Sequence, residues 1–187
     1  MSTLAFRPVT KARWGDFEAL FSAPGAPSYC WCMAWRATTQ ERKRHSNAER
    51  KAQMKSRVTR KVQVGLLAYE KGAPVAWVSV AAKENINRLG GPEAPGEKIW
   101  SLTCMFVPRS QRGKGLAHEL IAGAVAYATK RGATILEAYP VEPDSPSYRY
   151  MGFVPAFAAA GFQPVATAGK RRHVMRKRLM PASHPES

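Results

Sequence analysis

The sequence of 187 residues carries 29 Lys and Arg against 13 Asp and Glu, a formal net charge of +16, and 45% of its residues are hydrophobic. This length and composition indicate one globular domain, which we place at residues 1–180, followed by a disordered tail at 181–187. No apolar run approaches the roughly 20 residues that a membrane-spanning helix needs, and the first residues lack the pattern of an export signal. We therefore expect a cytoplasmic protein that does not enter a membrane.

Much of the excess positive charge lies in two clusters, residues 36–61 and residues 170–178. Clusters of this kind are most often solvated faces, and in other proteins they bind nucleic acid or another acidic partner. Nucleic acid is therefore possible as a partner but is not favoured.

Three cysteines occur, and Cys30 and Cys32 are separated only by Trp31, a spacing poorly suited to a disulfide between them. No second Cys or His pair stands at a spacing typical of zinc sites, so we expect no metal. The dense group of aromatic and sulfur side chains around these cysteines is more typical of a core, or of a cover over a binding site, than of a metal site. We therefore expect the protein to reside in a reducing compartment, with its cysteines unpaired.

The first quarter of the chain predicts one strand and two helices. Residues 4–9 read as a strand, and Thr10 is placed to cap a helix whose apolar positions recur at helical spacing. Residues 22–28 break this helix with Pro and Gly. Ser46 and Glu49 have the spacing of a capping box, so a second helix is expected to run from there to about Lys61.

The rest of the chain alternates strands and helices. A glycine-containing turn between residues 64–69 and 74–81 predicts a hairpin, and a loop follows at 85–96. Later elements are a strand at 99–107, a helix to about Lys130 that stops at Gly132, a strand at 134–139, a short helix within 148–160, and extended pieces near 162–166 and 173–179. The order predicts an α/β protein with a central mixed, mostly antiparallel sheet of about six to seven strands flanked by helices.

The polar turn at residues 109–115 leads from a predicted strand directly into a helix. Gly113 and Gly115 allow the backbone to approach a ligand without a Cβ in the way, and a helix start leaves N–H groups without intrahelical partners. These groups and the helix dipole suit a phosphate. The spacing is neither that of a P-loop nor GxGxxG, because His118 stands where the third glycine would fall.

The segment QRGKGLA, residues 111–117, resembles the pyrophosphate loop of the GNAT acyltransferases that use acetyl-CoA. Further segments are similar to one bacterial GNAT subfamily, and the resemblance covers most of residues 1–180. They are CWCMAWR near the start, GLLAYEKGAPVAWVSVA in the hairpin, LEAYPVEP after the long helix, AGFQPV, and VMRKRL near the end. The resemblance implies the GNAT fold and acetyl-CoA as the acyl donor.

The resemblance also implies which residues bind the donor. The strand backbone at Met105, Phe106 and Val107 is expected to hydrogen-bond the pantetheine arm, where this strand splays from the next one. The turn is expected to hold the pyrophosphate through Gln111, Arg112, Gly113, Lys114, Gly115, Leu116 and Ala117.

Acetyl transfer to an amine needs a base for the amine, a donor for the oxyanion and a proton for the leaving thiolate. Glu84, expected at the mouth of the cleft, is the first candidate for the base, ahead of Glu97 and Glu137. Many GNAT enzymes use a tyrosine four residues before a Gly-Phe pair as the acid, but this position holds Phe157. Tyr148 and Tyr150 are the candidates to replace it, with Tyr148 preferred.

The acceptor site is expected between the aromatic segment 29–36 and the proline-rich segment after Tyr139. The predicted acceptor-binding residues are Trp31, Met33, Trp35, Arg36 and Tyr150. A small-molecule primary amine is the preferred acceptor, and the positive net charge favours one that bears carboxylate or phosphate groups over a polycation.

Three alternatives to a small-molecule acceptor stay open. The acceptor amine belongs to a protein in the first and to aminoacyl-tRNA in the second. The third is a non-catalytic CoA-binding module that holds a polyanion. A monomer or a homodimer is expected in each case.

Overall fold

The computed structural model of the protein describes residues 4–43 and 46–180. The predicted disordered tail, residues 181–187, lies outside the described residues. Within the described ranges, no helix combines the length and the apolar character that a membrane crossing requires.

Seven strands form one sheet in the order β1-β2-β3-β4-β5-β7-β6. All neighbouring strands are antiparallel except β4 and β5, which are parallel. The strands are β1 (Ala5–Pro8), β2 (Leu66–Glu70), β3 (Ala73–Ala82), β4 (Ile99–Phe106), β5 (Ile135–Ala138), β6 (Gln163–Ala168) and β7 (Arg172–Arg178). The predicted mixed, mostly antiparallel sheet of six to seven strands is confirmed.

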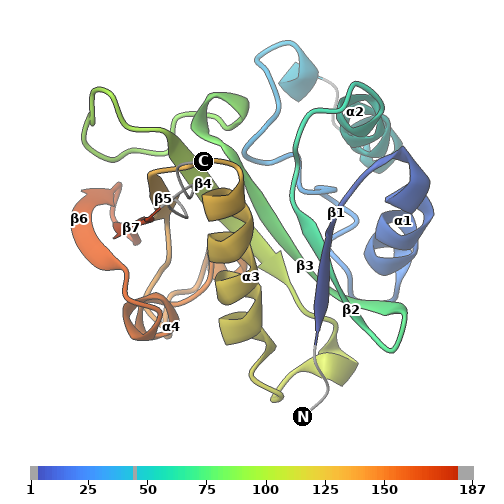
Figure 1. Ribbon diagram of the computed structural model, residues 1–187. Helices are drawn as coiled ribbons and strands as arrows, with labels where there is room; N and C mark the ends of the chain where they lie inside the picture. Colours follow the sequence, from blue (N-terminus) through green and yellow to red (C-terminus); the bar gives the residue numbers. More distant parts are fainter. Residues whose placement is uncertain (1–3, 44–45, 181–187) are drawn as a thin grey trace, which may run out of the picture.

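Four α-helices accompany the sheet in the part of the chain that the structure describes (Figure 1). They are α1 (Trp14–Ser22), α2 (Asn47–Thr59), α3 (Leu116–Lys130) and α4 (Val154–Ala159). Short 3₁₀ helices lie at Lys11–Arg13, Glu41–Lys43, Lys83–Asn85, Arg109–Gln111 and Arg149–Met151.

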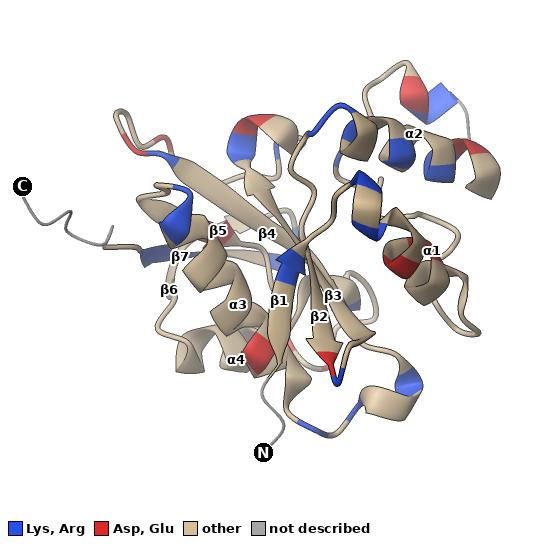
Figure 2. Cartoon of the chain, turned by 45° about the vertical axis from the view of Figure 1, so that its right-hand side comes forward, with Lys and Arg blue, Asp and Glu red and all other residues tan. Residues whose placement is uncertain are grey.

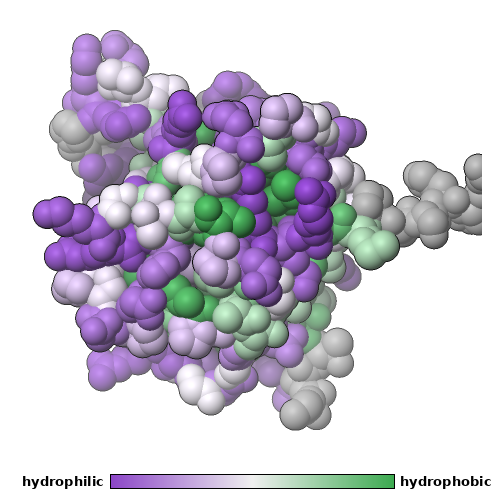
Figure 3. Space-filling model, turned by 90° about the vertical axis from the view of Figure 1, so that its left-hand side faces the viewer, coloured by the Kyte–Doolittle hydropathy of each residue, from purple (hydrophilic) through white to green (hydrophobic). Residues whose placement is uncertain are grey.

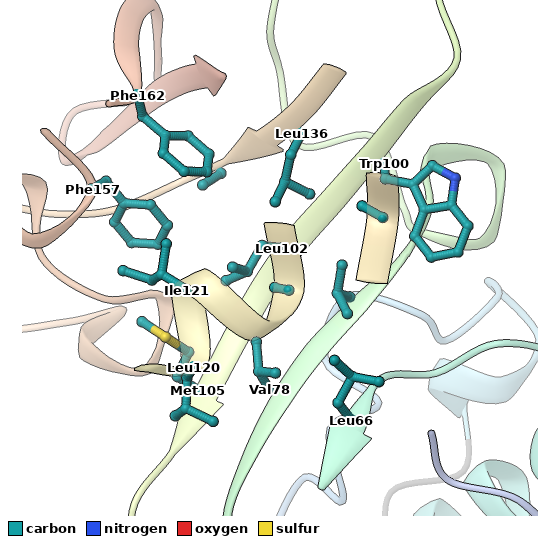
Figure 4. Close-up of a cluster of buried hydrophobic side chains, with 14 of the residues drawn as sticks. Leu66, Val78, Trp100, Leu102, Met105, Leu120, Ile121, Leu136, Phe157 and Phe162 are labelled. Carbon is teal, nitrogen blue, oxygen red and sulfur yellow. The ribbon is translucent and has the colours of Figure 1, made fainter. Parts of the chain in front are cut away.

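Side chains that alternate along β3 enter two different cores, because successive residues of a strand point to opposite faces. Val78 and Val80 pack with Leu120 and Ile121 of α3, in the core of Figure 4. Trp77 packs on the other face, with α1 and α2. The sheet is therefore covered by α3 on one face and by α1 and α2 on the other.

Both predicted N-terminal helices form, but they begin differently. The apolar positions of α1 are buried as expected, whereas Thr10 has an extended backbone and makes no side-chain cap, and the chain makes one 3₁₀ turn before Trp14. The capping box of α2 is present, since Ser46 accepts from the Glu49 amide at 3.1 Å and the Glu49 carboxylate accepts from the Ser46 amide at 3.1 Å.

The predicted hairpin closes more tightly than the sequence suggested. Its strands continue to Glu70 and Ala73, which leaves only Lys71 and Gly72 in the turn, with φ values of 50° and 83°. Two successive positive φ values are typical of the type I′ turn, whose twist matches that of the strands.

The side of the molecule at β6, β7 and α4 shows hydrophobic side chains in small groups between hydrophilic ones (Figure 3). Such a mixed pattern is ordinary for a face in contact with water.

Candidate functional site

The parallel strands β4 and β5 separate halfway along β4. Their pairing runs from Ile99↔Ile135 to Leu102↔Ala138, and β4 then continues to Phe106 beside β3 alone. The chain after β5 turns away and pairs through Val141. The peptide groups of β4 beyond Leu102 are thus free on one side to bond a ligand.

A cavity of about 520 Å³ lies where the two strands have separated. Its lining residues come from the end of β4, the loop before α3, the start of α3, and the segment that ends in α4: Met105, Val107, Arg112, Ala117, Arg149, Tyr150, Gly152, Phe153 and Ala156. The structure therefore brings together four residues predicted for the donor, Met105, Val107, Arg112 and Ala117, and Tyr150, predicted for the acceptor. Phe106 points to the opposite face, where its ring lies 5.8 Å from that of Phe21.

The loop after β4 exposes backbone and positive charge beside this cavity. Gly113 and Gly115 have φ values of +77° and +75°, and a Cβ at either position would meet no other atom within 4 Å. Arg112 Nε donates to the Val107 carbonyl at 3.2 Å, and Lys114 Nζ donates to Gln111 Oε1 at 2.8 Å. Leu116 follows as the first residue of α3. The open space and the exposed cations suit an anion held against the loop.

Phe157 forms part of the core beneath the cavity. Its ring is fully buried, edge-to-face with Phe162 at 5.2 Å. Gly152 has a φ of +86°, and a Cβ there would lie 2.6 Å from Met105 Cε and 2.7 Å from Phe157 Cε2. This position therefore needs glycine for both its backbone and its space.

Trp35 and Tyr148 meet on the opposite face of the sheet from α3. Their ring centres lie 6.0 Å apart, and the guanidinium of Arg172 lies 5.2 Å from the Trp35 ring centre and 5.3 Å from that of Tyr148. The aromatic segment and the segment after Tyr139 are thus in contact here, as the sequence analysis expected of the acceptor site. Arg172 was missed. Its only sequence signal was membership of the basic cluster 170–178.

The other residues predicted for the acceptor are buried. Trp31, Met33 and Arg36 are only 4%, 1% and 4% exposed. Trp31 stacks on Phe21 with ring centres 5.7 Å apart, because the apolar stripe of α1 needs cover. Trp31 and Met33 belong to the core that covers α1 and α2, and Met33 also lines a separate cavity of about 420 Å³. None of the three residues lines the 520 Å³ cavity.

The carboxylates proposed as bases do not line the 520 Å³ cavity. Glu84 lies beyond the Ala82↔Trp100 end of the β3–β4 ladder and lines a different cavity of about 670 Å³. The reason is strand direction, since β3 is antiparallel to β4 and the end of β3 therefore lies at the start of β4. The expectation that Glu84 stands at the mouth of the same cleft is not met.

Glu137 and Glu97 are engaged elsewhere. Glu137 is fully buried, and its carboxylate accepts from Arg176 Nε at 2.7 Å and from the Tyr139 hydroxyl at 2.6 Å. Lys83 Nζ lies 2.8 Å from the same carboxylate. Glu97 accepts from Arg178 Nη1 at 2.9 Å.

Cys32 and Cys104 form a buried thiol pair next to Arg36. The hydrogen bond from Cys104, together with the nearby Arg36 guanidinium, lowers the pKa of Cys32 to about 6, and the same bond raises the pKa of Cys104. Trp77 Nε1 also donates to Cys32 Sγ, at 3.3 Å. Among the described residues, no group of three or more His, Cys, Asp or Glu side chains could hold a metal ion.

Comparison with known proteins agrees with this geometry. A family model described as the acetyltransferase (GNAT) family matches residues 26–153. No curated protein matches the chain. Several solved structures are similar in fold over nearly the whole chain.

One is an uncharacterized protein from Bacillus halodurans, with a TM-score of 0.63 and 16% identity over 95% of this chain and 84% of that one. Another is aminoglycoside acetyltransferase AAC(6')-Ib in complex with coenzyme A, with a TM-score of 0.60 and 16% identity over 94% and 95% of the two chains. A third is yncA from Salmonella typhimurium with its cofactor acetyl-CoA, with a TM-score of 0.54 and 16% identity over 98% of each chain. By its match to the family model over residues 26–153, this chain belongs to the acetyltransferase (GNAT) family.

Proposed function

We propose that this protein transfers the acetyl group of acetyl-CoA to the primary amine of a small molecule. The observation that carries the proposal is the 520 Å³ cavity at the separation of β4 and β5, with the glycine loop and the start of α3 at its rim. The proposal treats residues 1–180 as one catalytic domain, active as a monomer or a homodimer in the cytoplasm.

The residues present fit the donor. The free side of β4 at Met105, Phe106 and Val107 offers peptide groups to the amide-bearing pantetheine arm. The space open at both loop glycines and the exposed Arg112 and Lys114 suit its pyrophosphate. When bound, acetyl-CoA supplies an activated acetyl thioester.

We assign the roles of proton donor and acceptor contact to two different tyrosines. Tyr150 lines the cavity beside Met105, so we assign it the proton that the leaving thiolate needs. Tyr148 lies against Trp35 and belongs to the acceptor side. Glu84 is assigned no step, because it opens into the other cavity, and the acceptor amine enters as the free base.

The contacts of the basic clusters support a small-molecule acceptor over a polyanion. Figure 2 shows Lys and Arg along α2, but several of them are engaged within the protein. Lys51 pairs with Glu18, Lys55 lies 5.9 Å from the Trp14 ring centre, and Arg57 pairs with Glu41 at 2.7 Å. Cations held in this way are less available to phosphates.

The resemblance to a bacterial subfamily with the CWCMAWR segment belongs to the same proposal. The structure offers a physical reason for such a segment, since Trp31, Cys32, Met33 and Arg36 are all buried. We propose that the segment is a rigid support for Trp35 at the acceptor site.

The test is release of free CoA thiol from acetyl-CoA across a panel of amines. We expect thiol release with at least one class of small amine and formation of the acetylated product. Tight CoA binding with no thiol release across the panel would contradict the proposal. Affinity for single-stranded RNA that falls steeply with salt would instead favour the polyanion-binding alternative.

A further inference from the structure

Arg172 differs from the other arginines of β7 in having no acidic partner. Arg176 binds Glu137 at 2.7 Å and Arg178 binds Glu97 at 2.9 Å. Within the described part of the chain, Arg172 makes no ion pair and no side-chain hydrogen bond, and its Nη1 is buried without a partner. Most buried polar side-chain atoms have a hydrogen-bond partner, so an acceptor from outside the described residues would complete the bonding of this nitrogen.

The guanidinium is held in place by rings rather than by anions. It lies 5.2 Å from the Trp35 ring centre and 5.3 Å from that of Tyr148. Such cation–π contacts fix the position of the group without neutralising its charge. The N–H groups of a guanidinium held in this way have no acceptor among the described residues, and a planar carboxylate can bond two of them at once.

The position of Arg172 connects it to the donor cavity. Its backbone forms an antiparallel bridge with Val141, and Val141 forms a parallel bridge with Phe153, which lines the 520 Å³ cavity. The Val141 amide also donates to the carbonyl of Gly152, another lining residue, at 3.0 Å. The backbone of Arg172 is therefore separated from the cavity lining by one chain segment, the one that contains Val141.

The two sequence neighbours of Arg172 are bonded to other groups. Arg171 Nη1 donates to Ser147 Oγ at 3.0 Å, and His173 Nε2 lies 2.9 Å from Glu142. Arg171 keeps its charge in this bond to a neutral hydroxyl, so the surface here is positive, and the planar guanidinium of Arg172 matches the two oxygens of a carboxylate.

We propose that Arg172, positioned by Trp35 and Tyr148, binds the carboxylate of the acceptor, so that the acceptors are small amino carboxylates. The inference rests on the proposed function only in taking the acceptor to be an amine. It names the class of substrate and adds Arg172 as the residue that determines specificity.

The first experiment measures binding, which does not depend on turnover. Calorimetric titrations compare L-phenylalanine, L-leucine and L-glutamate with the carboxamide and the aminophosphonate analogue of each, on the CoA-loaded protein. We expect at least one amino acid to bind about 10- to 100-fold more tightly than its carboxamide, the range of a charge-assisted bidentate pair. Equal affinities across all pairs, or tighter binding of the phosphonate than of the carboxylate, would overturn the proposal.

Variants then test the residue. Arg172→Gln should abolish the preference for the carboxylate, Arg172→Lys should keep part of it, and the neighbouring Arg171→Gln should keep all of it. Arg172→Lys retains a cation and keeps the test valid if Arg172→Gln proves unstable in thermal unfolding. A preference that survives in both Arg172 variants would overturn the assignment.

Thiol release separates this inference from the proposed function. A carboxylate preference in binding without any thiol release would leave the Arg172 site standing and contradict the acetyltransferase proposal. Thiol release at equal kcat/KM for acids and amides would support the acetyltransferase proposal and contradict the assignment of Arg172. The amine of a carboxamide loses its proton more readily than that of the amino acid, so a preference for the acid cannot arise from the amine.

Discussion

The guanidinium of Arg36 donates to the Ser79 hydroxyl at 2.7 Å, joining the aromatic segment to the middle of β3. The same group donates to the Val64 carbonyl at 2.6 Å and to the Cys32 carbonyl at 3.3 Å. Burial lowers the pKa of Arg36, and the neighbouring Cys32 opposes this shift. Arg36 therefore acts as a clamp that holds the segment on which Trp35 is placed.

Removing this clamp should destabilise the protein. We expect Arg36→Met to lower the free energy of unfolding by about 2–4 kcal/mol, because the Ser79 and Val64 oxygens lose a buried, charged donor. The measurement is denaturant unfolding. Arg178→Met is the matched control, since the side chain of Arg178 in its ion pair with Glu97 is exposed, and its loss should cost much less stability than Arg36→Met. Equal losses in the two variants would argue against the clamp.

The Cys32 thiolate should make stability depend on pH. The pKa of Cys32 is lowered to about 6 in the folded protein, whereas in the unfolded chain it is close to the usual value of about 8.5. A lowered pKa contributes stability that is fully present above the unfolded value and is lost as pH falls through the folded one. The free energy of unfolding should therefore rise from pH 6 to pH 8.5.

Cys32→Ser provides the control for this pH dependence. It removes the thiolate and should flatten the rise, as measured by denaturant unfolding in a series of buffers. The same slope in Cys32→Ser and in the parent protein would show that another group causes it.

The glycine loop should tolerate a side chain in the free protein but not with CoA bound. Gly113 and the distant Gly25 both have a φ of +77° and open space where a Cβ would lie. Replacing either with Leu should cost about 1–2 kcal/mol of stability through the same backbone strain. Only Gly113→Leu should weaken CoA binding, because its side chain would occupy the space where the loop is proposed to hold the pyrophosphate. We expect the affinity measured by calorimetry to fall by about 100-fold or more. Unchanged affinity in Gly113→Leu would refute the placement of the donor.

The two tyrosines should respond differently to loss of the hydroxyl. Tyr150→Phe should lower kcat by about 100-fold with little change in KM for acetyl-CoA, as expected for a lost proton donor. Tyr148→Phe keeps the ring against Trp35 and Arg172 and should change kcat by less than about 5-fold, since a general acid accounts for far larger effects. The measurement is kcat from steady-state kinetics with a good acceptor. A larger loss of kcat in Tyr148→Phe than in Tyr150→Phe would assign the acid role to Tyr148 instead.

Glu137 should behave as a structural residue. Glu137→Gln leaves Lys83 and Arg176 without their carboxylate, and we expect a loss of about 3–5 kcal/mol in unfolding experiments. Glu84→Gln changes an exposed side chain and should stay within about 0.5 kcal/mol of the parent protein. A small effect of Glu137→Gln would indicate that its burial in this cluster is not important for stability.

The sequence was sufficient to predict most strands and helices and to propose the donor loop, because these depend on local rules. The spacing of apolar residues marked α1 and α3, and Ser46 with Glu49 marked the start of α2. Gly113 and Gly115 stood out because a residue without a Cβ lets the backbone approach a ligand, and the structure adds that both have a positive φ.

Only the tertiary structure decided which of these residues meet. Because β3 runs antiparallel to β4, Glu84 lies away from the 520 Å³ cavity. Trp31 is buried in the core because it packs against the apolar face of α1. Arg172 gained its place because β7 lies beside Val141, a contact between distant parts of the chain that no local pattern records. The proposed donor loop lies in one continuous stretch that a sequence pattern can mark, whereas the 520 Å³ cavity beside it also needs residues 149–156, and the proposed acceptor site combines three separate segments that only packing brings together.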